Sequence, residues 1–150
     1  MSNTFSAPAS LSDENLFFLF RTYGTRTLHW RNKFIGLLPE VNRRKLYEKK
    51  GFHSIFEFAA KLAGVSKEQL GTAINLERDF EDKPLLKKLL VNGEVSINKL
   101  VRIQSVATTE NQEFWATQVQ LLPNRALETL VRDERKISEQ NVEENQNRDG

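Results

Sequence analysis

Residues 54–75 constrain the fold most, because they contain two helix-start signals with a glycine between them. A serine followed three residues later by glutamate or glutamine forms a capping box, in which each side chain binds a backbone N–H of the other residue. A glycine often ends a helix, because the residue after a helix commonly adopts the left-handed conformation and glycine does so at low cost. The pattern predicts helices over residues 54–64 and 67–80. The signals are Ser54 with Glu57, Gly64, and Ser66 with Gln69.

Helical periodicity also dominates the rest of the chain, and strand-type alternation is nearly absent. We expect Gly24 to end the first helix and Pro39 to begin the third. Connections of about 3–5 residues make sequential helices pack against each other, so the sequence predicts an all-α, compact multi-helix bundle. The further predicted helices cover residues 12–23, 27–38, 39–50, 84–92, 96–106, 109–119 and 124–135.

The two ends of the chain have compositions that do not support a core. Residues 1–10 are rich in Ser, Asn, Ala and Pro, and residues 137–150 in Glu, Gln, Asn and Arg, so both are predicted to be disordered. Residues 11–136 are the predicted all-helical domain, with a helix-turn-helix at 54–80. The chain has no apolar run near the roughly 18 residues of a membrane helix, which predicts no membrane partner. It also has no basic N-terminal signal and no cysteine, which favours the cytoplasm.

Charge is distributed unevenly along the chain. From Arg26 to Lys50 there are eight basic and two acidic residues, a net charge of +6. Residues 138–150 contain four acids and one arginine, a net charge of −3. The basic segment is what a polyanion-binding protein needs, although it is equally compatible with a solvated basic helix face.

Residues 56–75 meet the steric demands of a helix-turn-helix, in which two short helices pack steeply around a short turn. We expect Ala60 to be the small residue where the helices cross, Gly64 to form the turn and Val65 to fill the angle. Leu70, with Ala73 or Ile74, is expected to point inward. The same A-x-x-x-G spacing also occurs in plain helical hairpins. The residues expected to face outward are Ser66, Lys67, Glu68, Thr72 and Asn75.

These offsets resemble the repressor-type helix-turn-helix. The resemblance implies that the second helix enters the DNA major groove, where Lys67 would donate to guanine and Asn75 would bond adenine. The base-reading residues it implies are Ser66, Lys67, Glu68, Gln69, Thr72 and Asn75. The second helix has few cations, so most phosphate contacts would come from the basic segment. The candidate phosphate-binding residues are Arg43, Arg44, Lys45, Lys49, Lys50 and Arg78.

A longer stretch, from about Leu38 to Arg135, resembles the helical domain that precedes the HNH nuclease module in many bacterial proteins. The resemblance implies a helical, DNA-associated domain. It rests on Arg43, Lys45 and Leu46, on residues 51–58 and 62–66, on Leu85 to Leu90, on Gly93 to Ser96, on Leu100, on Thr109 to Asn111 and on Leu127 to Val131.

The sequence departs from that family where the nuclease would follow. The cutting module needs histidines as metal ligand and general base, but the chain has only His29 and His53, both before the end of the helical domain. It also lacks a phosphate-cradling glycine loop and a nucleophile motif. We therefore expect no enzyme, no metal site and no cofactor.

Two functions remain open from the sequence. The first is a non-catalytic protein that binds double-stranded DNA, as a bacterial or mobile-element transcriptional regulator. It would be a homodimer through its N-terminal helices, because their apolar residues exceed what one face can bury. The second is a helical protein–protein adaptor without DNA binding. The apolar residues that favour a dimer are Phe17, Phe18, Leu19, Trp30, Phe34 and Ile35.

Overall fold

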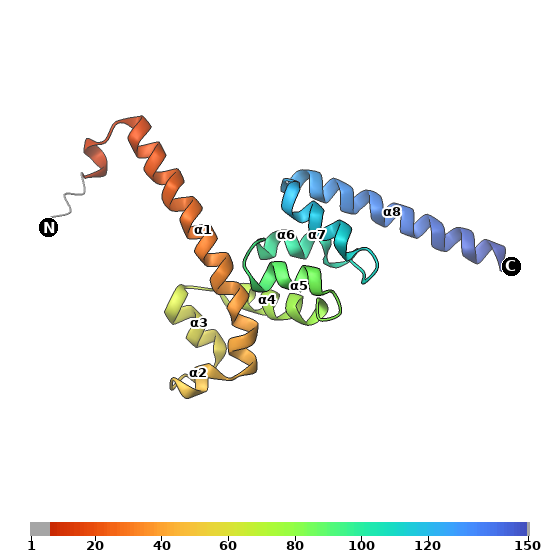
Figure 1. The fold of residues 1–150 in the computed structure, drawn as a ribbon, viewed down its shortest axis with the longest axis horizontal. Coiled ribbons are helices and arrows are strands. Elements are labelled where there is room, and N and C mark those ends of the chain that lie inside the picture. Colours follow the sequence, from red (N-terminus) through yellow and green to blue (C-terminus); the bar gives the residue numbers. More distant parts are fainter. Residues whose placement is uncertain (1–6, 150) are drawn as a thin grey trace.

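The computed structural model describes residues 7–149, and within this range every regular element is a helix. The all-α prediction is therefore confirmed. A short 3-10 turn, η1 (Pro8–Ser10), precedes the first α-helix. The α-helices are α1 (Asp13–Arg43), α2 (Leu46–Lys49), α3 (Ile55–Ala63), α4 (Lys67–Asp79), α5 (Pro84–Val91), α6 (Ile97–Gln104), α7 (Gln112–Leu121) and α8 (Asn124–Arg148) (Figure 1).

Helix α1 corrects the prediction of three separate helices between residues 12 and 50. Ser12 begins it, accepting a hydrogen bond from the backbone N–H of Asn15 at 3.2 Å. Gly24 continues the helix and does not adopt a positive φ. Pro39 also lies inside the helix, where it removes a backbone hydrogen bond, but it is buried against the bundle, so tertiary packing offsets that loss. The helix ends only before Lys45, which has a φ of 52°.

Helix α4 is the centre of the core. Leu70, Ala73, Leu76 and Phe80 follow each other at helical spacing, and each is fully buried. These side chains face α1, α3, α5 and α6, all of which contact α4. Helix α4 is therefore held on one side by the bundle, and only its opposite side is available to a ligand.

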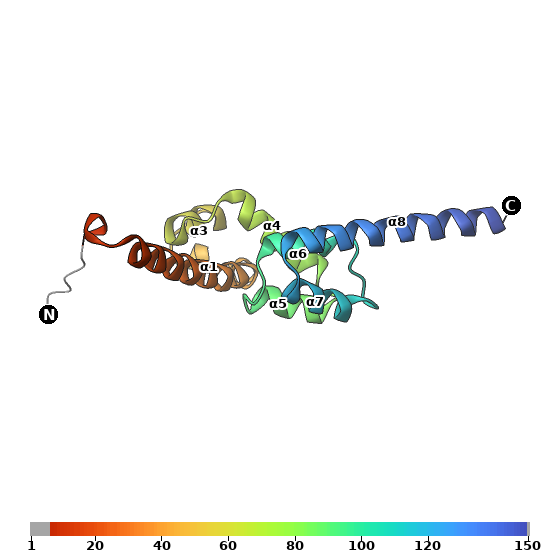
Figure 2. The same cartoon turned by 90° about the horizontal axis from the view of Figure 1, so that it is seen from above.

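Two glycines allow α1 to cross the end of α5 closely. A Cβ atom on Gly36 would lie closer than 3.0 Å to the backbone carbonyls of Leu90 and Val91. Gly93 has a φ of 65°, and a Cβ atom there would meet the backbone of Lys33. The second half of α1 is thus fixed to the bundle, whereas its first half extends away from it in both views (Figures 1 and 2).

Helix α8 also extends out of the bundle, at the end opposite to α1 (Figure 2). Its last buried residue is Val131, and residues 135–149 are exposed. Disorder was predicted for residues 137–150, but the helix continues to Arg148, so this boundary is corrected. The Glu, Gln, Lys and Arg residues of this stretch have good helix propensity. Glu144 and Arg148 are also four residues apart, a spacing of opposite charges that favours a helix without any core contact. Residues 1–6 of the predicted N-terminal tail, and Gly150, lie outside the described residues.

Among residues 7–149, no helix combines the length and the apolar character that crossing a bilayer requires.

Candidate nucleic-acid interface

Helices α3 and α4 meet at a sharp corner, and we call α3, residues 64–66 and α4 the corner. Gly64 ends α3 with a φ of 62°, and its N–H donates to the carbonyl of Ala60 at 3.0 Å. Val65, which is 3% exposed, fills the angle between the helices. Ser66 then starts α4 through a capping box with Gln69, in which both hydrogen bonds measure 3.2 Å. Gly64 and Val65 thus occupy the places that the sequence predicted for them.

The small residue at the helix crossing is Ala59, and the prediction of Ala60 is wrong by one position. Ala59 is fully buried, whereas Ala60 is exposed. The buried positions of α3 are Ile55 and Ala59, four residues apart on one face. The A-x-x-x-G spacing located the turn correctly but not the face that packs.

The predicted base-reading residues lie together along the first turns of α4, and four of them are exposed. Four of the six have side-chain hydrogen bonds within the chain, and these bonds limit their freedom to read bases: Ser66, Gln69, Thr72 and Asn75. Gln69 is half-buried and belongs to the capping box. Thr72 is half-buried, and its hydroxyl donates back to the carbonyl of Glu68 at 2.9 Å. The exposed residues are Ser66, Lys67, Glu68 and Asn75.

Asn75 is connected to a predicted phosphate-binding residue one turn further along α4. The guanidinium of Arg78 donates to the side-chain oxygen of Asn75, and both residues are exposed. This bond uses the side-chain oxygen of Asn75, and the two N–H donors of its amide group take no part in it. An arginine held beside a base-reading amide can contact a phosphate while it orients that amide.

Gly71 lies on the same exposed side of α4 and is not among the predicted site residues. A Cβ atom at this position would meet nothing within 4 Å. The glycine therefore leaves a gap between Glu68 and Asn75, where a ligand can approach the helix backbone closely. A glycine within the polar face of an otherwise regular helix was the signal that could have identified it.

Two lysines of the corner lie over aromatic rings that precede or form α3. The ammonium of Lys67 lies 5.3 Å from the ring centroid of Phe56, and that of Lys61 lies 5.8 Å from the centroid of Phe52. Such cation–π contacts hold a lysine stem in place while leaving its charge exposed. Lys61 was not among the predicted residues, although it lies on the polar side of α3.

The predicted phosphate-binding residues at the end of α1 are already paired. Glu40 accepts hydrogen bonds from Arg43 at 2.9 Å and from Arg44 at 2.6 Å. The bond from Arg43 is the main cause that lowers the pKa of Glu40 below its ordinary value of 4.5, and the bond from Arg44 adds to it. Because the pKa of Glu40 is lowered in the folded state, the pairing contributes to stability at neutral pH. This contribution is lost as the pH falls below 4.5 and through the lowered pKa of Glu40. Arg43 also lies within electrostatic range of Glu77 on α4.

Lys45, Lys49 and Lys50 are exposed on the short segment that connects α1 to α3. Beyond them, the ring of Phe52 packs edge-to-face on Phe58 of α3, with centroids 5.2 Å apart. This contact attaches the lysine-bearing segment to the corner, so its charges flank α3.

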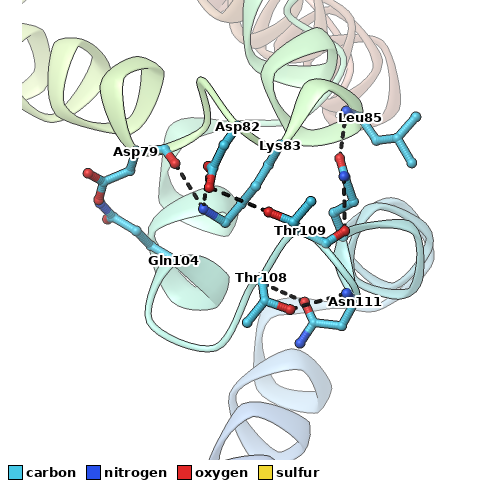
Figure 3. Close-up of polar contacts among 9 residues, drawn as sticks. Asp79, Asp82, Lys83, Leu85, Gln104, Thr108, Thr109 and Asn111 are labelled. Atoms are coloured by element: carbon cyan, nitrogen blue, oxygen red, sulfur yellow. Dashed lines mark hydrogen bonds and ion pairs between the residues drawn. The ribbon is translucent and has the colours of Figure 1, made fainter.

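The other end of α4 is fixed by a polar network, shown in Figure 3. Lys83 donates to the carbonyl of Asp79 at 3.0 Å and pairs with the carboxylate of Asp82 at 2.8 Å. Thr109 donates to Asp82 at 3.4 Å, and Gln104 donates to the carboxylate of Asp79. The hydrogen bond from Lys83 is the main cause that lowers the pKa of Asp82. The C-terminal end of α4 is thus anchored to α6 and to the α6–α7 loop, which leaves its N-terminal end as the accessible one.

Comparisons of the chain with protein-family models, with curated proteins and with solved structures return no match. Within residues 7–149, no three His, Asp or Glu side chains gather as metal ligands would.

Proposed function

We propose that the protein binds double-stranded DNA without cutting it, and that the corner lies in the major groove. The observation that carries this proposal is the two-sided character of α4. One side is fully buried in the bundle, while the other, from Ser66 to Asn75, is exposed, polar and open at Gly71. A helix that is backed by a core and polar on its outer side has the form that recognition helices use to reach base edges.

The charges around the corner support the same proposal. Lys67 lies in the first turn of α4 and Lys61 in the last turn of α3, while Lys49 and Lys50 lie on the segment attached to α3. The N-terminal end of α4 adds the partial positive charge of the helix dipole. Phosphate contacts supply most of the affinity for DNA, so Lys49, Lys50 and Lys61 are the proposed phosphate contacts, while Lys67 reads a base. Arg43 and Arg44 are secondary candidates for phosphate contacts, because both are already paired with Glu40.

We also propose that the protein acts as a cytoplasmic transcriptional regulator and works as a homodimer through the first half of α1. A single short recognition helix reads few base pairs, and operators commonly present two half-sites. Exposed apolar side chains on α1 support the dimer, among them Phe17, Phe20 and Trp30. The same side chains also favour the second candidate function, an adaptor that binds another protein and not DNA.

The test is equilibrium binding of the full chain to fluorescent duplex DNA at several salt concentrations. We expect log K to fall linearly with log salt, with a slope of about −0.9 for each phosphate contacted. Lys49→Ala should make the slope shallower by about one unit and weaken binding to all sequences. Asn75→Ala should instead relax the preference among sequences.

Lys88→Ala is the matched control, because Lys88 is an exposed lysine on α5, outside the corner. It should leave both slope and affinity unchanged. Binding that does not depend on salt, or an equal loss in the Lys49 and Lys88 variants, would contradict the proposal and favour the adaptor.

A further inference from the structure

The exposed side of α1 carries an apolar stripe with the spacing of a coiled coil. Its positions recur at alternating intervals of four and three, with one polar residue, Thr27, and with Phe34 partly buried against the core: Leu16, Phe20, Tyr23, Thr27, Trp30 and Phe34. This is the heptad pattern that pairs one helix with another. Phe20 is 78% exposed and Trp30 is 66% exposed, so the bundle leaves most of the stripe uncovered.

A groove runs beside the second half of this stripe. It has a volume of about 1410 Å³ and lies between α1, the turn at residues 63–65 and the end of α5. On α1, the groove is lined by stripe residues from Tyr23 to Phe34 and by their immediate neighbours. A helix roughly 10 Å across occupies about this volume over roughly three turns. The groove therefore has room for roughly three turns, or about 11 residues, of a docked helix, and the ends of a longer segment would extend beyond it.

We infer that the groove holds residues 13–27 of α1 from a second copy of this chain, with the two α1 helices antiparallel. In this register Phe20 of each copy lies opposite Trp30 of the other. Each copy then supplies a free half-helix and a groove, so the contact is reciprocal and closes as a two-fold dimer.

The charges of α1 favour this direction. No acidic residue occurs between Asn15 and Pro39, while the groove half carries Arg26, Arg31 and Lys33. A parallel pair would place Arg26 of each copy against Arg31 of the other, at the flanking positions that set helix orientation. The antiparallel pair keeps only one contact between like charges, Arg26 beside Arg26 near its centre. It also brings the acidic first turn of one copy, Asp13 and Glu14, toward the basic half of the other, where Glu94 is the one acidic residue among the groove-lining residues.

The area is sufficient for a dimer. Five side chains of the stripe and its continuation are between 44% and 78% exposed: Leu16, Phe20, Tyr23, Trp30 and Leu37. If each buries roughly 120 Å², about the exposed share of a large side chain, two copies bury on the order of 1,200 Å². That value reaches the range of stable, specific interfaces.

This dimer also spaces the two corners, a consequence that rests on the proposed function. The pairing is centred near residue 25, and each corner lies beside α1 about ten residues further on, where Phe34 and Gly64 line the same groove. At 1.5 Å per residue, the corners are about 30 Å apart along the helices. Half-sites one DNA turn apart are separated by about 34 Å.

The dimer is tested without DNA, so its failure is distinct from failure of the proposed function. Sedimentation equilibrium of the full chain should show a monomer–dimer equilibrium, and Phe20→Ala should raise its dissociation constant at least about tenfold. Phe18→Ala is the matched control, because Phe18 is 67% exposed on the same helix but lies off the stripe. A wild-type chain that stays monomeric, or an equal effect of the two variants, would overturn the inference.

Cysteine cross-linking tests the direction, on a chain that has no cysteine of its own. A mixture of the Phe20→Cys and Trp30→Cys variants should form a disulfide-linked heterodimer, while neither variant alone should cross-link. Identical positions are about 15 Å apart along an antiparallel pair, too far for a disulfide. Efficient self-linking of Phe20→Cys would establish a parallel pair and overturn the inference.

Discussion

At the scale of single residues, Gly71 shows the sharpest conflict between stability and the proposed role. A glycine within a helix costs roughly 0.5–1 kcal/mol relative to alanine, because it loses more backbone entropy on folding. Space around Gly71 is open, so no steric constraint inside the chain requires a glycine here. Under the proposed function, close approach of DNA accounts for the glycine, since a side chain at this position would obstruct the DNA backbone or a base edge.

Gly71→Ala should therefore stabilise the protein and weaken its binding to DNA. The free energy of unfolding is expected to rise by about 0.5–1 kcal/mol, and the affinity for duplex DNA to fall by about tenfold. Urea unfolding and fluorescence anisotropy measure the two effects on the same preparation. A more stable variant with unchanged DNA affinity would mean that DNA does not approach this side of α4.

At the scale of helices, the sequence located the corner better than it located the long helix before it. The capping signal at Ser66 and the turn at Gly64 are local, and local hydrogen bonds decide both. Gly24 and Pro39 also gave local signals, yet α1 passes through both. Pro39 is buried in the bundle, and the tertiary packing that keeps it in the helix cannot be read from neighbouring residues.

The choice between Ala59 and Ala60 gives a direct test of how α3 packs. Ala59→Leu should destabilise the protein by about 1–3 kcal/mol, because the added atoms have no space at the α3–α4 crossing. Ala60→Leu adds the same atoms at an exposed position and should change stability little. Thermal unfolding of both variants measures the difference. Equal destabilisation, or a larger loss at Ala60, would show that α3 packs through the other face.

At the scale of the whole molecule, the chain is a helical bundle from which two helices extend in opposite directions. Composition indicated the core and the charged segments, but not that Ile35 and Leu38 would be buried while Phe20 and Trp30, in the same helix, remain exposed. That division depends on where α1 crosses α4 and α5, which only the assembled bundle determines. The exposed part of α8 likewise became visible as a helix only in the structure.

The central claim is that DNA contacts the exposed side of α4. Its most direct test is a titration of the isotope-labelled full chain with a duplex of about 20 base pairs, followed by amide chemical shifts. We expect the largest changes between Ser66 and Asn75, smaller ones near Lys49 and Lys50, and none in the exposed end of α8. Changes confined to the first half of α1, or the absence of any change at low salt, would contradict the claim.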